Sequence, residues 1–296
     1  MNESSRVDAP ATGIRLGSKR TWLWITAVIL MAAAAVFQRV SGPTYPYKGS
    51  FTVGDETYRF RLVRSSETTH GARVALPFPD GIQTEARLHY RRYPTTDSLT
   101  TAPFVREGDE WAAYLPVEPA AGKMEYFVTL SLDEGRVRIP SDAEDSIILR
   151  YKDPVPLAVL LPHVILMFLS MLIGLRAALS ALFGSGDMRQ LTYLALAGMT
   201  LGGMIMGPIV QNYAFGEYWT GFPFGYDLTD NKTLIMWLCW VVAAGALWWG
   251  KARREAVKRG LIVAAAVVMV AVYLIPHSFR GSEYDYREET VGLTAD

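Results

Sequence analysis

The stretch Val155-Pro-Leu-Ala-Val-Leu-Leu-Pro-His-Val-Ile-Leu-Met-Phe-Leu-Ser-Met-Leu-Ile-Gly-Leu175 is apolar almost throughout and contains no Asp, Glu, Lys or Arg. A transmembrane helix needs about 20 mostly apolar residues to cross a hydrocarbon core of ~30 Å. Four other segments qualify or nearly qualify: Thr21–Gln38, Leu191–Val210, Thr233–Trp249 and Leu261–Pro276. Together they predict a polytopic α-helical membrane protein with about five transmembrane helices.

Between the first and second apolar segments, apolar and polar residues alternate. This period of two is typical of strands, and turn signals such as Gly54-Asp55 and Gly108-Asp109 punctuate it. The predicted strands are Ser50–Val53, Thr57–Val63, Arg73–Leu76, Ala86–Tyr93, Glu110–Leu115 and Met124–Leu130. Such a series of short strands predicts an all-β sandwich over residues 45–153.

The second half of this region has a familiar pattern. The strand Glu110–Leu115 is followed by Pro116, Pro119 and Gly122, and then by the strand that begins at Met124. This pattern resembles immunoglobulin-like and fibronectin type III domains. The resemblance covers about a third of the chain and implies a fold without a function, because such sandwiches serve many purposes.

Basic residues next to apolar segments predict the orientation, because they accumulate on the cytoplasmic side. They lie before the first segment, between the second and third, and between the fourth and fifth: Arg6, Arg15, Lys19, Arg20, Arg176, Arg189, Lys251, Arg253, Arg254, Lys258 and Arg259. All three places share one side if every segment spans. The predicted order is a cytoplasmic amino terminus (1–20), an anchor (21–38), the exported sandwich (45–153), a four-helix bundle (155–277) and an exported polar tail (278–296).

The first apolar segment has an alternative interpretation. Lys19-Arg20, an apolar core and the small residues Ala32–Ala35 are also typical of a cleaved secretory signal. Either interpretation exports the residues that follow it. The predicted location is therefore a membrane, in particular a bacterial inner membrane with the sandwich on the periplasmic side.

The connection between the third and fourth segments is rich in aromatic residues and turns. It reads Phe215-Gly-Glu-Tyr-Trp-Thr-Gly-Phe-Pro-Phe-Gly-Tyr-Asp227. Its polar groups need partners, since lipid tails supply none. Two histidines, His163 and His277, lie toward the same outer side as this loop in the predicted orientation.

These residue types suit haem, because haem iron takes axial imidazoles from opposite sides of the ring. Aromatic rings could pack against the macrocycle. The glycines of the third segment, Gly198, Gly202, Gly203 and Gly207, allow close helix packing and could also make room for a flat cofactor.

The order His163, aromatic loop, His277 resembles the cytochrome c biogenesis haem-handling proteins, whose external tryptophan-rich loop lies between two histidines. The matching residues are Tyr218-Trp219 and Asp227-Leu228-Thr229, followed by an apolar helix. The resemblance implies haem b bound by His163 and His277, with Tyr218, Trp219, Tyr226 and Asp227 around it. The chain departs from the family at Phe215 and Tyr226, where tryptophans are usual, and in having about five predicted spans.

Two alternatives remain open for the loop. Aromatic residues gather at membrane interfaces without any ligand, and Asp227, Thr229 or Asp230 could simply cap the following helix. A second possibility is a metal site formed by Asp227, Asp230, Glu217 and His277.

The sequence contains no motif that indicates another kind of catalytic or binding site. The chain has no P-loop, GxSxG or HExxH motif, and its single cysteine, Cys239, allows no disulfide. The 29 basic and 29 acidic residues balance, so no nucleic-acid partner is expected. No catalytic residue is predicted. The two functional hypotheses are haem binding for electron transfer or haem delivery, and a membrane scaffold whose exported sandwich binds a partner protein.

Overall fold

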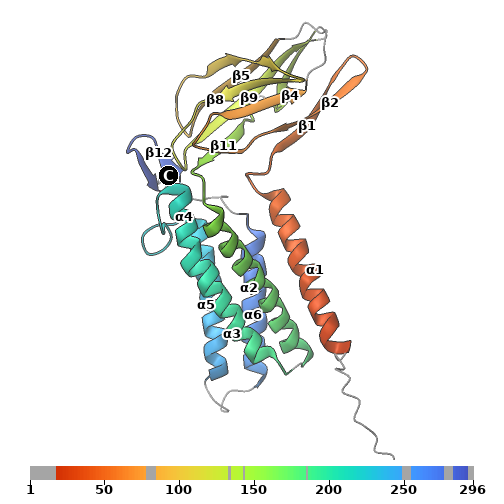
Figure 1. The fold of residues 1–296 in the computed structure, drawn as a ribbon, viewed down its shortest axis with the longest axis vertical. Helices are drawn as coiled ribbons and strands as arrows, with labels where there is room; N and C mark the ends of the chain where they lie inside the picture. Colours follow the sequence, from red (N-terminus) through yellow and green to blue (C-terminus); the bar gives the residue numbers. More distant parts are fainter. Residues whose placement is uncertain are drawn as a thin grey trace, which may run out of the picture.

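The computed structural model describes residues 18–77, 85–132, 135–142, 144–184, 186–248, 255–276 and 283–292. A bundle of long helices carries a β-rich part at one end (Figure 1). We call this the β-domain end of the bundle and the opposite end the far end. The predicted cytoplasmic residues 1–17 and the basic stretch 249–254 lie outside the described residues.

The helices are α1 (Ser18–Ser41), α2 (Leu157–Phe183), α3 (Met188–Met199), α4 (Gly207–Phe215), α5 (Leu228–Trp248) and α6 (Glu255–Leu274). A π-helical turn, η1 (Thr200–Met206), joins α3 to α4 so that the three form one continuous rod. Among the described residues, five helical stretches are long and apolar enough to cross a membrane: Thr21–Ser41, Leu157–Phe183, Met188–Phe215, Leu228–Trp248 and Glu255–Leu274. The predicted number of membrane-spanning segments is thus confirmed by length and composition.

The second of these stretches extends further than the sequence indicated. Arg176, predicted to border the connection between spans, lies inside α2 and is fully buried. Its guanidinium pairs with Asp187 at 3.0 Å, and Ser180 Oγ donates to the same carboxylate at 2.8 Å. Because the charge is paired, the helix can continue to Phe183.

The strands of the β-domain are β1 (Tyr47–Val53), β2 (Glu56–Leu62), β3 (Ser65–Glu67), β4 (Ala72–Pro77), β5 (Glu85–Tyr93), β6 (Thr100–Pro103), β7 (Val105–Glu107), β8 (Glu110–Leu115), β9 (Lys123–Leu132), β10 (Gly135–Ile139) and β11 (Ile147–Lys152). All six predicted strands have a counterpart among them. One sheet has the order β3-β11-β9-β5-β6, with β10 also paired to β9, and a second has the order β4-β8-β7. β1 and β2 form a separate hairpin.

The sheets share one hydrophobic core. Its fully buried members include Val74 of β4, Leu88 of β5, Leu115 of β8 and Val128 of β9. Alternate residues of β9 are buried, as the period of two requires when one face of a strand packs inward. The immunoglobulin-like type of this domain stays a prediction.

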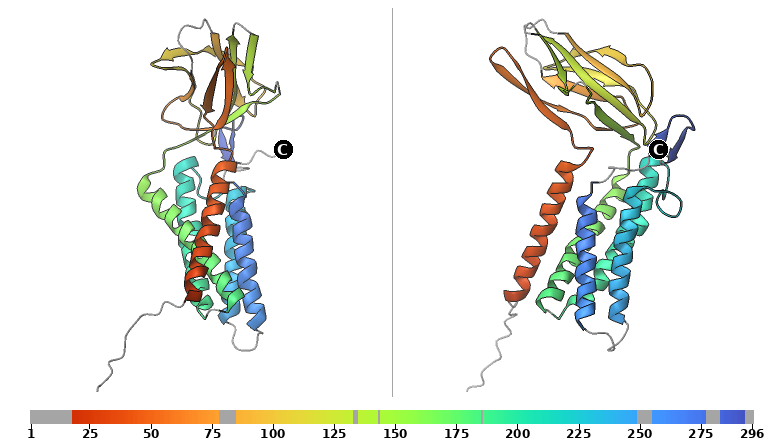
Figure 2. Two further views of the ribbon diagram at one scale, coloured as in Figure 1. Left: turned by 90° about the vertical axis from the view of Figure 1, so that its right-hand side faces the viewer. Right: turned by 180° about the vertical axis from the view of Figure 1, so that it is seen from behind.

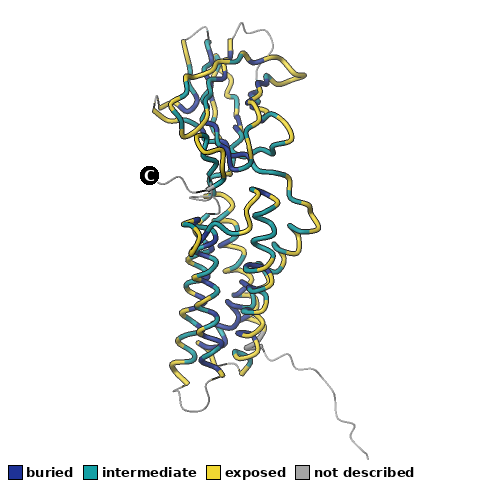
Figure 3. Tube along the Cα trace, turned by 90° about the vertical axis from the view of Figure 1, so that its left-hand side faces the viewer, coloured by how far each residue is buried: buried dark blue, intermediate teal, exposed yellow. Residues whose placement is uncertain are grey.

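A second core lies within the bundle, and it is concentrated away from the β-domain end (Figure 3). In α2 the buried residues run from Ser170 to Ala181, whereas no residue from Leu157 to Leu169 is buried.

The glycines mostly serve packing. A Cβ on Gly202 would lie 2.8 Å from Leu166 Cβ, and one on Gly198 would lie 3.2 Å from Ser170 Cβ. The glycine-rich rod can therefore approach α2 closely.

The carboxyl-terminal segment is structured where the sequence predicted a polar tail. β12 (Glu283–Asp285) and β13 (Thr290–Gly292) form an antiparallel hairpin that packs beside the β-domain (Figures 1 and 2). Tyr286 Oη donates to Lys123 O at 2.9 Å and accepts the Lys123 N–H at 3.0 Å. Glu283 forms an ion pair with the Lys123 ammonium. The hairpin therefore ties the chain after α6 to β9.

Candidate functional site

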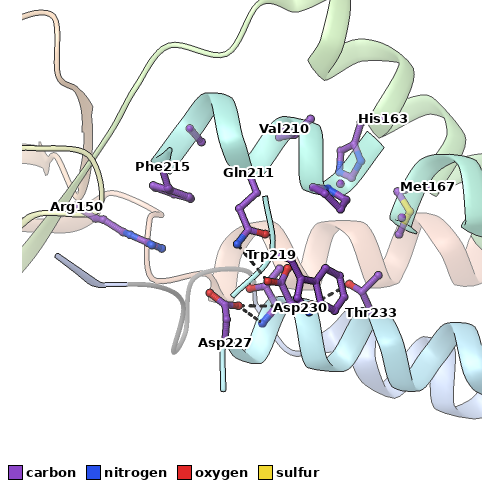
Figure 4. A pocket seen from close by; sticks show the side chains of 15 residues that line it. Arg150, His163, Met167, Val210, Gln211, Phe215, Trp219, Asp227, Asp230 and Thr233 are labelled. Carbon is purple, nitrogen blue, oxygen red and sulfur yellow. Dashed lines mark hydrogen bonds between the residues drawn. The ribbon is translucent and has the colours of Figure 1, made fainter. Parts of the chain in front are cut away.

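A cavity of about 160 Å³ lies where the β-domain meets the bundle (Figure 4). The strand β11, the helices α2, α4 and α5, the turn η1 and the aromatic loop all contribute to its wall. Its lining residues are Arg150, His163, Met167, Gly203, Gly207, Pro208, Val210, Gln211, Ala214, Phe215, Trp219, Asp227, Thr229, Asp230 and Thr233. We call it the junction cavity.

His163 reaches the cavity from α2, directly after Pro162. Its Nδ1 lies 2.8 Å from the carbonyl oxygen of Gly202 in η1. A carbonyl can only accept, so Nδ1 carries the proton, and in the neutral imidazole Nε2 is then the nitrogen with a lone pair. Metal-ligating histidines commonly hold their second nitrogen in this way. Gly207 borders the same imidazole, since an added Cβ there would lie 3.8 Å from His163 Cε1.

The aromatic loop, residues 216–227, is held by side chains of the helix that follows it. Asp230 Oδ2 accepts the Thr220 N–H at 2.7 Å and a Gln211 amide hydrogen at 3.2 Å. Asn231 Oδ1 accepts the Phe222 N–H at 2.6 Å. These bonds satisfy backbone groups that lipid could not satisfy, and they fix the loop onto the first turn of α5.

Glycines make this tight arrangement possible. A Cβ on Gly221 would lie 2.5 Å from Asp230 Cβ, and one on Gly225 would lie 2.4 Å from the Thr220 carbonyl oxygen. Both separations are far inside van der Waals contact. The loop conformation therefore requires glycine at both positions.

Asp227 has two roles in this geometry. Its Oδ1 accepts the N–H groups of Thr229 at 2.7 Å and Asp230 at 3.3 Å, which caps the start of α5. The residue is also buried and lines the junction cavity. The capping role predicted for this region is present, and it does not prevent Asp227 from facing a ligand.

Arg150 brings a positive charge to the cavity from the end of β11. Its guanidinium carbon lies 4.3 Å from the centre of the Phe215 ring, within the range of a cation–π contact. Burial lowers the pKa of Arg150, while the carboxylates of Asp227 and Glu283 oppose that shift. An arginine stays charged regardless, so the cavity wall includes a fixed cation that interacts with Asp227.

Lys232 lies one turn after the start of α5 and connects the loop region to the end of α6. Its buried ammonium donates to the carbonyl oxygens of Ile275 at 2.8 Å and Pro276 at 3.3 Å. These carbonyls lie at the end of a helix, where such groups have no partner within the helix. The contact places the end of α6 beside the start of α5.

The predicted site residues divide into three groups. His163, Trp219 and Asp227 line the junction cavity. Tyr218 and Tyr226 do not line it and are 60% and 83% exposed. His277 lies outside the described residues.

The possible metal site is divided in a similar way. Asp227 and Asp230 both line the cavity, but Glu217 is exposed and His277 is not described. Among the described residues, no three His, Cys, Asp or Glu side chains are grouped as a metal ion would need.

Sequence reasoning missed Arg150 and Gln211. Arg150 belongs to β11, a strand that was not predicted, and it enters the cavity only because the β-domain docks on the bundle. Gln211 lies in α4, directly after the third predicted apolar segment, which ends at Val210. Amide side chains at the end of an apolar segment, here Gln211 and Asn212, are a usable signal, because they need a polar partner there.

Comparison with models of known protein families and with curated proteins found no match to this chain.

Proposed function

We propose that this is an integral membrane protein that binds haem b at the junction cavity, with His163 as an axial ligand. The proposed role is electron transfer, or haem delivery for cytochrome c maturation, at the outer face of a bacterial inner membrane. The β-domain is proposed to be an exported immunoglobulin-like sandwich on the periplasmic side, which docks a partner protein.

The observation that carries this proposal is the environment of His163. The imidazole lies toward the β-domain end, its Nδ1–H is held by Gly202 and its Nε2 is left for a ligand. Trp219 and Asp227, predicted from the same sequence argument, line the same cavity. Residues of two separate segments, α2 and the aromatic loop, thus converge on one cavity.

The other lining groups match haem by type. Arg150 would pair with a propionate, because arginine binds carboxylates through charge-assisted hydrogen bonds. Trp219 would pack against the ring and exclude water. Haem would supply one-electron chemistry at this position. His277, outside the described residues, remains the proposed second axial ligand.

The enclosed volume sets a condition on the proposal. Sites for drug-sized ligands enclose roughly 300–1,000 Å³, and the junction cavity encloses about 160 Å³. A macrocycle does not fit inside the cavity in this shape. Haem binding therefore requires the residues around the cavity to move apart.

The test uses His163→Asn in protein expressed with haem supplied. Asparagine keeps an N–H that can donate to Gly202, but it removes the imidazole ligand. The proposal expects the visible absorption of haem to be lost or strongly shifted. The matched control is His89→Asn in the β-domain, which should leave the spectrum unchanged. Equal spectra for both variants would contradict the role of His163.

A second candidate function is a non-catalytic membrane scaffold or accessory subunit whose exported domain binds a partner protein. The small cavity favours it, and so do the hydrogen bonds within the protein: Asp230 and Asn231 accept N–H groups of the loop, and Asp227 accepts an N–H group of α5. This candidate expects a colourless protein. The same spectra therefore distinguish the two.

A further inference from the structure

The aromatic loop presents two kinds of aromatic side chain. Trp219 faces the junction cavity, as described above. The other four rings point away from protein and are largely exposed: Tyr218 60%, Phe222 65%, Phe224 83% and Tyr226 83%. Exposed apolar groups gathered in one place usually mark a surface that something covers.

The exposed rings are not a consequence of a loose loop. Trp219 Nε1 donates to the Phe222 carbonyl at 3.0 Å, and the Phe222 N–H is bound by Asn231. The backbone of Phe222 is thus held through both its N–H and its carbonyl group. The exposure of these rings therefore follows from the conformation in which the loop is held.

The loop lies at the β-domain end of two membrane-spanning stretches, because it joins the end of α4 to the start of α5. In two views it projects sideways from the bundle at the level of the helix ends (Figures 1 and 2). The helices that the loop joins also have exposed apolar residues, such as Tyr213 at 46% and Ile235 at 54%. Those helix residues face lipid if the helices span.

The charge of the loop also bears on its partner. The charged residues of the loop are Glu217 and the buried Asp227, and there is no Lys or Arg. Attraction to anionic groups therefore contributes nothing to covering this surface. Aromatic rings favour the headgroup zone of a bilayer whatever its charge.

From these observations we infer that the aromatic loop is an interfacial anchor. It inserts the rings of Phe222, Phe224 and Tyr226 into the headgroup region of the leaflet on the β-domain side. The occupant of this surface is lipid, because the loop joins the ends of two stretches that are long and apolar enough to cross a membrane and contains no Lys or Arg. The inference depends on membrane insertion and does not depend on haem.

The test measures depth with a fluorescent label on single cysteines. Cys239→Ala removes the native thiol, and Phe224→Cys places the label on the loop. Two exposed positions serve as matched references: Val242→Cys on α5, 56% exposed, and Val105→Cys on β7, 61% exposed. Each variant is reconstituted without haem into phosphatidylcholine vesicles that carry a nitroxide either on the headgroup or in the middle of the acyl chain.

The Phe224 label should be quenched most strongly by the headgroup nitroxide, at least about twofold more than the Val105 label. It should also be shielded from iodide, which should quench the Val105 label freely. The Val242 label should respond mainly to the acyl-chain nitroxide. Tyr226→Cys, at an equally exposed position, repeats the measurement if the Phe224 variant does not fold.

A loop label that behaves like the Val105 label would overturn the inference. That result would place the loop in water and leave its rings for a protein partner. Since haem is absent from the experiment, either result is independent of the proposed haem site.

Discussion

Asp230 illustrates how a single side chain organises the candidate site. Its Oδ2 binds the Thr220 backbone and the Gln211 amide, which joins α4, the aromatic loop and α5 around the cavity. Asp227 and His163 similarly combine a structural hydrogen bond with a place in the cavity wall. At the scale of the residue, a structural hydrogen bond is therefore compatible with a place in the cavity wall.

His89 offers a pH prediction away from the membrane. Burial, followed by the charges of Arg87, Arg136 and Arg138, lowers the pKa of His89. The unfolded chain then binds more protons than the folded chain below the ordinary histidine pKa of about 6.5. The contribution of His89 to stability is therefore lost as the pH falls below that value.

The expected result is a larger fall in Tm between pH 7.5 and pH 5.5 for the native chain than for His89→Gln, by about 1 °C. Glutamine can keep hydrogen bonds to Thr101 and Thr129, which lie 3.0 Å and 2.9 Å from the imidazole nitrogens. Carboxylates that titrate in this range affect both proteins alike. Equal falls in Tm would contradict the lowered pKa.

Helix packing gives a prediction at the scale of the element. Gly202→Ala would place a Cβ 2.8 Å from Leu166 Cβ and force η1 away from α2. Overpacking of this kind costs about 1–3 kcal/mol. Thermal unfolding in detergent should show a clear loss of stability.

The control for this change is Gly245→Ala in α5. An added Cβ there meets no atom within 4 Å, so only the gain in helix propensity applies, about 1 kcal/mol or less. Its stability should be unchanged or slightly higher. The same loss of stability in both variants would show that close packing is not what Gly202 provides.

The carboxyl-terminal hairpin gives a second prediction at this scale. Tyr286→Phe removes both hydrogen bonds to the Lys123 backbone, at a cost of about 1 kcal/mol. Hydrogen exchange in residues 283–292 should become faster.

Tyr114→Phe is the matched control for the hairpin. Its hydroxyl binds the exposed Glu107 elsewhere in the β-domain, and its loss should leave exchange in the hairpin unchanged. Unchanged exchange in Tyr286→Phe would mean that other contacts hold the hairpin in place.

At the scale of the whole molecule, three segments tie the β-domain to the helices. The chain enters the domain from α1 and leaves it from β11 into α2, where the Asp153 N–H donates to Ala214 O of α4 at 2.9 Å. The hairpin of β12 and β13 supplies the third tie. This arrangement places Arg150 over Phe215 and completes the wall of the junction cavity.

The sequence predicted the elements that have a repeating local signal. Apolar runs of sufficient length indicated all five possible spans, and alternation indicated β5, β8 and β9. The strand β3, Ser65-Ser-Glu67, has no apolar residue and gave no such signal. The hairpin of β12 and β13 was missed because Tyr286 meets Lys123 only through a contact between distant parts of the chain.

The candidate site was predictable in part for the same reason. Residue type and orientation indicated His163, Trp219 and Asp227. Which aromatic rings turn inward depends on bonds from Asp230 and Asn231 to the loop, which no local pattern encodes. Tyr218 and Tyr226 therefore could not be separated from Trp219 by sequence alone.

The central claim is that the junction cavity binds haem. The most direct measurement is the absorption spectrum of the detergent-purified protein, expressed with haem supplied, together with a pyridine haemochrome assay of the haem content. The account predicts a Soret band and about one haem per chain, both depending on His163. A featureless spectrum under these conditions would contradict it and leave the scaffold function as the better account.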